Sequence, residues 1–189
     1  GAILAAEGDR PGARARFEAS LAIDRALADA DPQSAQAQRD LFVSLNKLGA
    51  ILAAEGDRPG ARARFEESLA IARALADADP QSAQAQRDLA ISFERMGDID
   101  QQDGDPAGAI DWYRKSRDLV QDLRARDREN AGLRRDVAEM TSKLAGLPGS
   151  GVGWSEALAE WRAIAADGVL ALDDASLLAE AEHRAADAD

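Results

Sequence analysis

The feature that most constrains this chain is an internal repeat that divides it into units of equal length. Residues 1–48 align without gaps on residues 49–96, and only eight positions differ. A third copy, residues 97–144, shares 13 of its 48 positions with the second. One unit repeated at a fixed spacing predicts an array in which each repeat packs mainly against its neighbours.

The composition indicates that each repeat is helical. The chain of 189 residues contains 43 Ala, about three times the combined number of the β-branched types Val, Ile and Thr. Ala favours helices, whereas β-branched residues favour strands. We therefore predict an all-α chain.

The apolar spacing predicts two amphipathic helices in each repeat. The first carries leucines four, three and four residues apart, which places them on one face: Leu41, Leu45, Leu48 and Leu52. Residues 56–60 break the pattern, and Asp57 can cap the second helix with Pro59 in its first turn. The second helix should end at Asp79, because the residue before Pro80 is disfavoured in the helical region.

A short motif recurs at the boundary between the two helices. Leu48-Gly49 is followed twelve residues later by Ala61, and four residues after that by Phe65. The same spacing links Gly1, Ala13 and Phe17, and also Met96-Gly97, Ala109 and Tyr113. This pattern, over residues 1 to about 167, resembles the tetratricopeptide repeat. The resemblance implies an α-solenoid of antiparallel helix pairs, a superhelix closed by a C-terminal capping helix.

The period of 48 is longer than the usual 34 of that family. The excess divides into two segments of seven residues, and each adds about two helical turns without changing the phase of the apolar face. We therefore expect helices of about 20 residues. In this respect the chain is similar to the long-helix repeats of bacterial signalling and scaffold proteins, which implies a cytoplasmic location.

We predict one array over residues 1–189, with repeats at 1–48, 49–96 and 97–144 and a degenerate unit with a cap at 145–189. In the last unit Ala145, Ala157 and Trp161 keep the motif spacing, but the glycine run at 146–153 should end its first helix early. Asp173 is expected to cap a last helix whose inward residues are Leu177, Leu178, Ala181 and Ala185. Residues 1–8 read as the tail of a further helix, so the array should continue upstream and its open end could self-associate.

Several classes of function are disfavoured. The chain has no Cys and a single His, His183, which removes thiol chemistry, zinc clusters and most histidine acid–base chemistry. The net charge is −12, and residues 145–189 alone carry −7, which opposes binding to nucleic acid or anionic membranes. The glycine run lacks the Lys-Ser/Thr of a phosphate loop, and the acidic residues 98–105 miss the calcium-loop spacing. We expect no enzyme activity, cofactor or metal, and we expect the three Trp residues to pack between helices or over the final loop.

A binding surface remains. The resemblance implies that the first helix of each pair lines the concave face and holds a segment of a protein or peptide partner. The candidate contact residues are Arg39, Val43, Asn46, Arg87, Ile91, Glu94, Asp98, Gln101, Arg135 and Glu139. Six of the eight differences between the first two repeats fall at positions 42–48 of this helix. A varied recognition helix would produce that pattern, and so would a recombination boundary near residue 41.

The arginines of this set recur at Arg39, Arg87 and Arg135, and each is followed by an Asp. They can bridge neighbouring repeats, or they can contact the partner. The sequence therefore predicts a non-catalytic protein-interaction scaffold. The alternative is a structural, self-assembling or sensor arm of a larger multidomain bacterial signalling protein.

Overall fold

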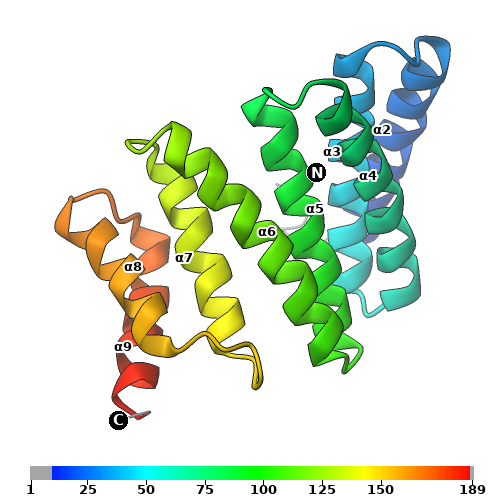
Figure 1. Ribbon diagram of the computed structural model, residues 1–189. Helices are drawn as coiled ribbons and strands as arrows, with labels where there is room; N and C mark the ends of the chain where they lie inside the picture. The colour runs from blue at the N-terminus through cyan, green and yellow to red at the C-terminus, as the bar shows by residue number, and fades with distance from the viewer. Residues whose placement is uncertain (1–9, 188–189) are drawn as a thin grey trace. The chain divides into compact units, whose positions relative to one another are not determined.

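The computed structural model describes residues 10–187, with side chains from residue 14 onward. This part of the chain is helical and contains no strand (Figure 1). Its helices are α2 (Arg10–Ala30), α3 (Ala35–Ala54), α4 (Arg58–Ala78), α5 (Ala83–Gln102), α6 (Pro106–Arg126), α7 (Ala131–Ala145), α8 (Trp154–Ala166), the 3₁₀ turn η1 (Leu172–Asp174) and α9 (Ala175–Ala186). The predicted all-α class is confirmed.

The helix boundaries repeat with the period of the sequence. Helices α2, α4, α6 and α8 begin at residues 10, 58, 106 and 154, so each start lies one period after the last. Helices α3, α5 and α7 begin at residues 35, 83 and 131 with the same interval. From α2 to α6 each helix has 20 or 21 residues, as the long period predicts.

Side-chain caps fix where the helices begin. Asp57 Oδ1 accepts a hydrogen bond of 2.9 Å from the Gly60 N–H, and Asp105 Oδ1 accepts the same bond from Gly108. These caps satisfy backbone donors that have no partner within the first turn. The predicted capping role of Asp57 is confirmed, and so is the end of α4 before Asp79.

The described part of the chain divides into two compact units, one that ends at Ile99 and one that begins at Asp100. The division falls close to the boundary between the second and third repeats. In the first unit α3 packs against both α2 and α4, and consecutive helices run in opposite directions (Figure 1). In the second unit α7 packs against α6 and α8, and α9 packs against α8. That all four repeats form one array stays a prediction.

The core of the first unit follows the predicted leucine stripe. The four leucines of α3 are each at most 5% exposed, and α4, which packs against α3, also buries Phe65 and Leu69. A Cβ atom added to Gly49 would lie 2.6 Å from Phe65 Cε1, well inside van der Waals contact. The Gly-aromatic spacing of the repeat therefore reflects a close approach of α3 to the ring on α4.

Apolar clusters on both sides of α7 contribute to the core of the second unit. Tyr113 of α6 packs with Met140 and Leu144 of α7, and Trp161 of α8 packs with Ala138 of α7 and Ala181 of α9. Tyr113 and Trp161 are fully buried. Three of the predicted inward residues of the last helix, Leu177, Leu178 and Ala181, lie in the second cluster, whereas Ala185 is only half-buried. Helix α9 packs against α8 through this cluster, as expected of a cap.

The glycine run ends α7 at Ala145, as the sequence predicts. Gly149 and Gly151 adopt φ values of 86° and 72°, which favour glycine because a Cβ atom would be strained there. The predicted cap of the last helix is wrong by one residue. Asp173 lies inside η1, and the N-cap position of α9 is Asp174, whose side chain makes no capping bond. The helix predicted for residues 1–8 lies outside the described residues.

Candidate partner-binding surface

Seven of the predicted contact residues lie in the first unit. Each is half-buried, neither in the core nor fully exposed. Those on α3 are Arg39, Val43 and Asn46, and those on α5 are Arg87, Ile91, Glu94 and Asp98. The set therefore lies along the first helices of two successive pairs, the position that the repeat predicts for a binding face.

Arg39 connects these two helices. Its Nε donates a hydrogen bond of 2.7 Å to Asp88 Oδ2 on α5, and its Nη2 lies 3.4 Å from Oδ1. Asp88 is only 2% exposed, and its Oδ1 also accepts a 2.9 Å bond from Gln84. A buried carboxylate needs such partners because its desolvation is costly. Arg39 therefore bridges neighbouring repeats, which is one of the two interpretations of the arginine series.

Arg135 has the corresponding role in the second unit. Its Nε lies 2.8 Å from both carboxylate oxygens of Asp174, which is 2% exposed, and its Nη1 lies 3.2 Å from Glu139. The hydrogen bond to Asp174 is the main cause that raises the pKa of Arg135, and the charge of Glu139 adds to it. Arg135 thus anchors the turn before α9 and also orients Glu139, another predicted contact residue.

Asn46 has an incomplete set of hydrogen bonds. Its Nδ2 donates to the Phe42 carbonyl at 3.0 Å, which ties the amide to its own helix. Its Oδ1 is buried and has no hydrogen-bond partner within the described residues. The repeat carries Glu94 and Ser142 at the equivalent positions, so each pair of helices presents a different polar group here.

The second unit contains a hollow that includes two of the predicted contact residues, Gln101 and Glu139. Its volume is about 370 Å³. We call it the α7–α9 hollow, and it is lined by Gln101, Glu139, Ser142, Lys143, Gly146, Trp154, Trp161, Leu177, Glu180 and Arg184. The aromatic rings and Leu177 form an apolar part, while two acidic and two basic side chains supply balanced charge. Such a combination suits a segment that is partly apolar and carries charges of both signs.

Hydrogen bonds and ring contacts hold the walls of the α7–α9 hollow. Trp161 Nε1 donates to Ser142 Oγ at 2.9 Å, and the Tyr113 hydroxyl donates to Gln101 Oε1 at 3.0 Å. Arg184 lies over the Trp154 ring, with Cζ 5.7 Å from its centre. These contacts position side chains from several helices before any ligand arrives, which reduces the entropy lost on binding.

The sequence reasoning misses several residues of this hollow, among them Lys143, Trp154, Glu180 and Arg184. It predicts only packing for Trp154, yet this residue is half-buried and lines the hollow. Comparison with the equivalent positions of the other repeats could have identified Trp154. The equivalent positions are Arg10, Arg58 and Pro106, so a large aromatic residue there is not required by the repeat itself.

The acidic segment at residues 98–105 serves the fold. Asp100 is buried and accepts a 2.9 Å hydrogen bond from Trp112 Nε1, while Asp105 caps α6. Within residues 10–187, His, Cys, Asp and Glu side chains form no group of three or more that could hold a metal ion. The carboxylates of Asp100 and Asp105 therefore have structural partners.

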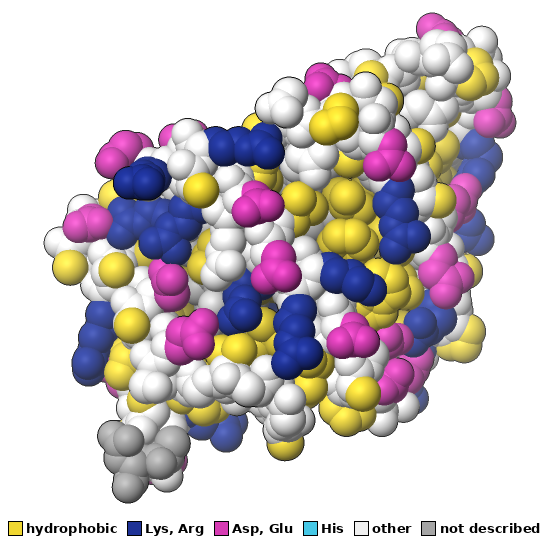
Figure 2. All heavy atoms as spheres, in the orientation of Figure 1, with side chains coloured by type: hydrophobic (Ala, Val, Ile, Leu, Met, Phe, Trp, Pro, Cys, Tyr) yellow, Lys and Arg dark blue, Asp and Glu magenta, His cyan; other side chains and the backbone are white. Residues whose placement is uncertain are grey.

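The charges on the surface are mixed. Figure 2 shows one face on which basic and acidic side chains alternate, with hydrophobic side chains exposed between them. None of the helices in the described part of the chain combines the length and the apolar character that a membrane crossing requires.

Comparison with known proteins supports the repeat. Residues 40–101, which begin within α3 and stop one residue before the end of α5, match the tetratricopeptide repeat family. A search of curated proteins finds no match. The family match indicates protein–protein interaction as the class of function, and repeats of this type are typically non-catalytic.

Proposed function

We propose that this chain is a non-catalytic interaction module that holds a segment of a protein partner on the first helices of its repeats. In the second unit the binding site is the α7–α9 hollow. The observation that carries the proposal is the lining of this hollow, which joins Gln101 and Glu139 to an apolar wall of Trp154, Trp161 and Leu177.

The chemistry of the hollow defines the kind of partner segment. An aliphatic or aromatic side chain would fill the apolar part, because burying one such side chain contributes about 1.5–3 kcal/mol. Basic residues of the segment would pair with Glu139 of α7 or Glu180 of α9, and acidic residues would pair with Lys143 of α7 or Arg184 of α9. An amphipathic helix or an extended peptide with alternating charge meets both requirements.

The test is a peptide ligand selected against the intact chain from a displayed library. Its affinity is then measured for two variants of α9, Glu180→Lys and the matched control Glu182→Lys. Both glutamates are exposed and form surface ion pairs, at 3.7 Å to Arg184 and 3.3 Å to Arg162. Only Glu180 lines the α7–α9 hollow.

We expect Glu180→Lys to change the dissociation constant by about fivefold or more, since a like charge near a ligand group costs about as much as a surface pair contributes. Glu182→Lys should change it by less than about twofold. Equal effects of the two substitutions, or no effect of either, would place the ligand elsewhere on the chain.

A second candidate function is self-association through α2. Ile23 and Leu27 are 63% and 56% exposed on this helix, whereas Leu123 on α6, the equivalent of Leu27, is 3% exposed. Ser20 is likewise exposed, while its equivalents Ser68 and Ser116 are buried. The same face of the repeat is thus covered on α4 and α6 but open on α2 within the described residues, and a second copy of the chain could cover it.

Light scattering coupled to gel filtration tests this candidate over a hundredfold range of concentration. Self-association predicts a mass that rises above 20.0 kDa with concentration. Leu27→Lys should restore the monomer mass, while Ala22→Lys, an exposed control on the same helix, should leave association intact. A constant monomer mass for the wild type would remove the candidate.

A further inference from the structure

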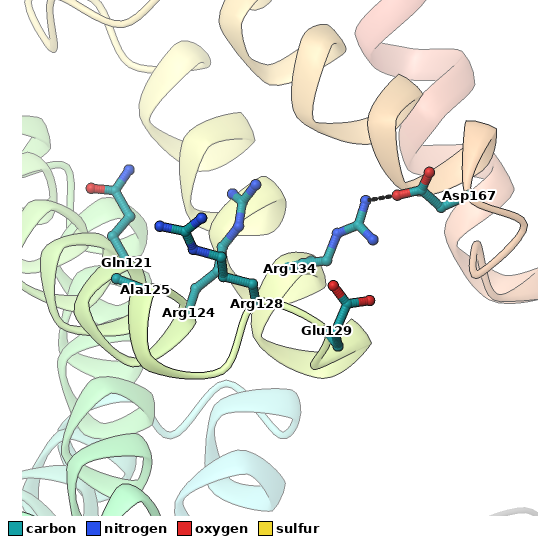
Figure 3. Close-up of a pocket in the computed structure, with 7 residues that line it drawn as sticks. All are labelled: Gln121, Arg124, Ala125, Arg128, Glu129, Arg134 and Asp167. Atoms are coloured by element: carbon teal, nitrogen blue, oxygen red, sulfur yellow. Dashed lines mark hydrogen bonds and ion pairs between the residues drawn. The ribbon is translucent and has the colours of Figure 1, made fainter.

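A second hollow lies at the other end of α7 and includes three arginines. Its volume is about 530 Å³, and it lies between the end of α6, the turn at residues 127–130, the start of α7 and Asp167 after α8. Figure 3 shows Arg124 and Arg128 extending from the same stretch of chain, with Arg134 directed towards Asp167. We call it the arginine hollow.

The repeat shows that these arginines are not needed to build the turn. The turn amides of Asp31, Asp79 and Asp127 each donate a 3.1 Å hydrogen bond to the residue four positions earlier. The turn is therefore the same in three copies. The first two copies carry other residues where the third carries Arg124, Arg128 and Arg134: Ala28, Pro32 and Gln38 in the first, and Ala76, Pro80 and Gln86 in the second.

Two of the arginines also form ion pairs with α8 and the residue after it. Arg124 Nη1 lies 2.8 Å from Glu160 Oε2, and Arg134 Nη2 lies 2.6 Å from Asp167 Oδ2. Arg134 donates as well to the Ala163 carbonyl at 3.1 Å. Arg128 differs from both, since it is exposed and forms no ion pair within residues 10–187.

The local charge contrasts with that of the chain. The lining of the arginine hollow contains three Arg and two acidic residues, Glu129 and Asp167, whereas the whole chain has a net charge of −12. An acidic chain does not need this cluster for solubility. A guanidinium has five N–H donors in a fixed plane, so Arg124 can bind a second acceptor in addition to Glu160. Arg128 can bind a carboxylate through two parallel hydrogen bonds, in a bidentate contact.

We propose that the arginine hollow binds a carboxylate-rich segment of a partner protein, with Arg128 and Arg124 as the groups that contact the carboxylates. Carboxylates are the groups that the neighbouring arginines already bind in this fold, through Glu160 and Asp167. Glu129 lies in the lining and opposes the ligand, so it limits the affinity. This site is separate from the α7–α9 hollow, so either can fail without the other.

The experiment measures the anisotropy of a fluorescein-labelled hexaglutamate peptide titrated with the intact chain at low salt, with hexaglutamine as the neutral control. Arg128→Gln should weaken hexaglutamate binding by about three- to fivefold, the value of one exposed ion pair. The matched variant is Arg126→Gln, which removes the same charge from the end of α6 but lies outside the lining. Its effect should be below about twofold.

A third variant reverses the sign of the effect. Glu129→Gln removes a carboxylate from the hollow and should strengthen hexaglutamate binding by about twofold. The three side chains are exposed, so these substitutions should leave the helical content unchanged, which circular dichroism verifies.

The proposal is overturned if Arg126→Gln weakens binding as much as Arg128→Gln, because the attraction is then a general effect of charge. It is also overturned if hexaglutamate binds no better than hexaglutamine. A phosphoserine peptide that binds where hexaglutamate does not would make the hollow a phosphate site, which likewise contradicts the carboxylate proposal.

Discussion

Substitution of Gly49 by Ala tests the packing of the repeat most sharply. Gly49 is buried in α3, and an added Cβ atom would lie 2.6, 2.8 and 3.0 Å from three carbon atoms of the Phe65 ring. Normal carbon–carbon contacts are about 3.5–4.0 Å. The ring is 3% exposed, so it has little room to move.

The expected magnitude is the difference between two effects. Overpacking of a core costs about 1–3 kcal/mol, and three close contacts favour the upper end. Ala stabilises a helix interior by about 1 kcal/mol relative to Gly. Gly49→Ala should therefore lower the free energy of unfolding by about 2 kcal/mol. Substitution of the neighbouring, exposed Ala50 by Gly measures the difference in helix propensity between Ala and Gly without any change in core packing.

The assay is chemical unfolding followed by far-UV circular dichroism, on Gly49→Ala, Phe65→Leu and the double variant. The smaller Leu side chain should accommodate the new methyl group, so the double variant should be more stable than the sum of the single effects predicts, by about 1 kcal/mol. If Gly49→Ala is as stable as the wild type, or more stable, the close approach of α3 to Phe65 does not limit this position.

Three further predictions concern polar contacts. Asp88→Asn should lower the free energy of unfolding by about 2 kcal/mol, because it breaks a buried ion pair. The control is Asp40→Asn at the equivalent but exposed position, which should lower it by less than about 0.5 kcal/mol in the same unfolding assay. The hydrogen bond from Arg25 lowers the pKa of Glu67 from 4.5, so this pair stabilises the folded state at neutral pH and loses its effect as the pH falls through the lowered value. Thermal unfolding of Glu67→Ala should therefore show a free energy of unfolding that is lower than that of the wild type by less than about 1 kcal/mol at neutral pH. Near pH 2 the two proteins should be equally stable. Asp57→Ala should cost about 1 kcal/mol through loss of the α4 cap, and an unchanged unfolding midpoint would contradict that role.

Much of the fold could be predicted because the sequence repeats its own boundaries. The start of α4 follows from Asp57 and Pro59, and the repeat then fixes the starts of the other long helices one period apart. The apolar stripe of α3 is predictable for the same reason, since local spacing alone decides which face is buried.

The last unit is harder to predict because contacts distant in sequence decide it. Arg39 pairs with a carboxylate 49 residues later, but Arg135 pairs with Asp174, only 39 residues later. Because the last unit is shorter than a full repeat, Asp174 takes the role towards Arg135 that Asp88 of the next repeat has towards Arg39. Asp174 is therefore buried, and Asp173 does not cap α9. Trp154 keeps the register of the repeat, but its equivalents Arg10, Arg58 and Pro106 are not aromatic, so the intact repeats do not indicate its place in the α7–α9 hollow.

The indole N–H signals of the three Trp residues test the proposed binding site most directly. Trp154 and Trp161 line the α7–α9 hollow, whereas Trp112 lies outside it with its Nε1 bonded to Asp100. A nitrogen–proton correlation spectrum, assigned with single Trp→Phe variants, is recorded while the selected peptide ligand is added. Our account predicts that the Trp154 and Trp161 signals shift in proportion to occupancy and that the Trp112 signal stays in place. Saturating binding that leaves both Trp154 and Trp161 unmoved would contradict it.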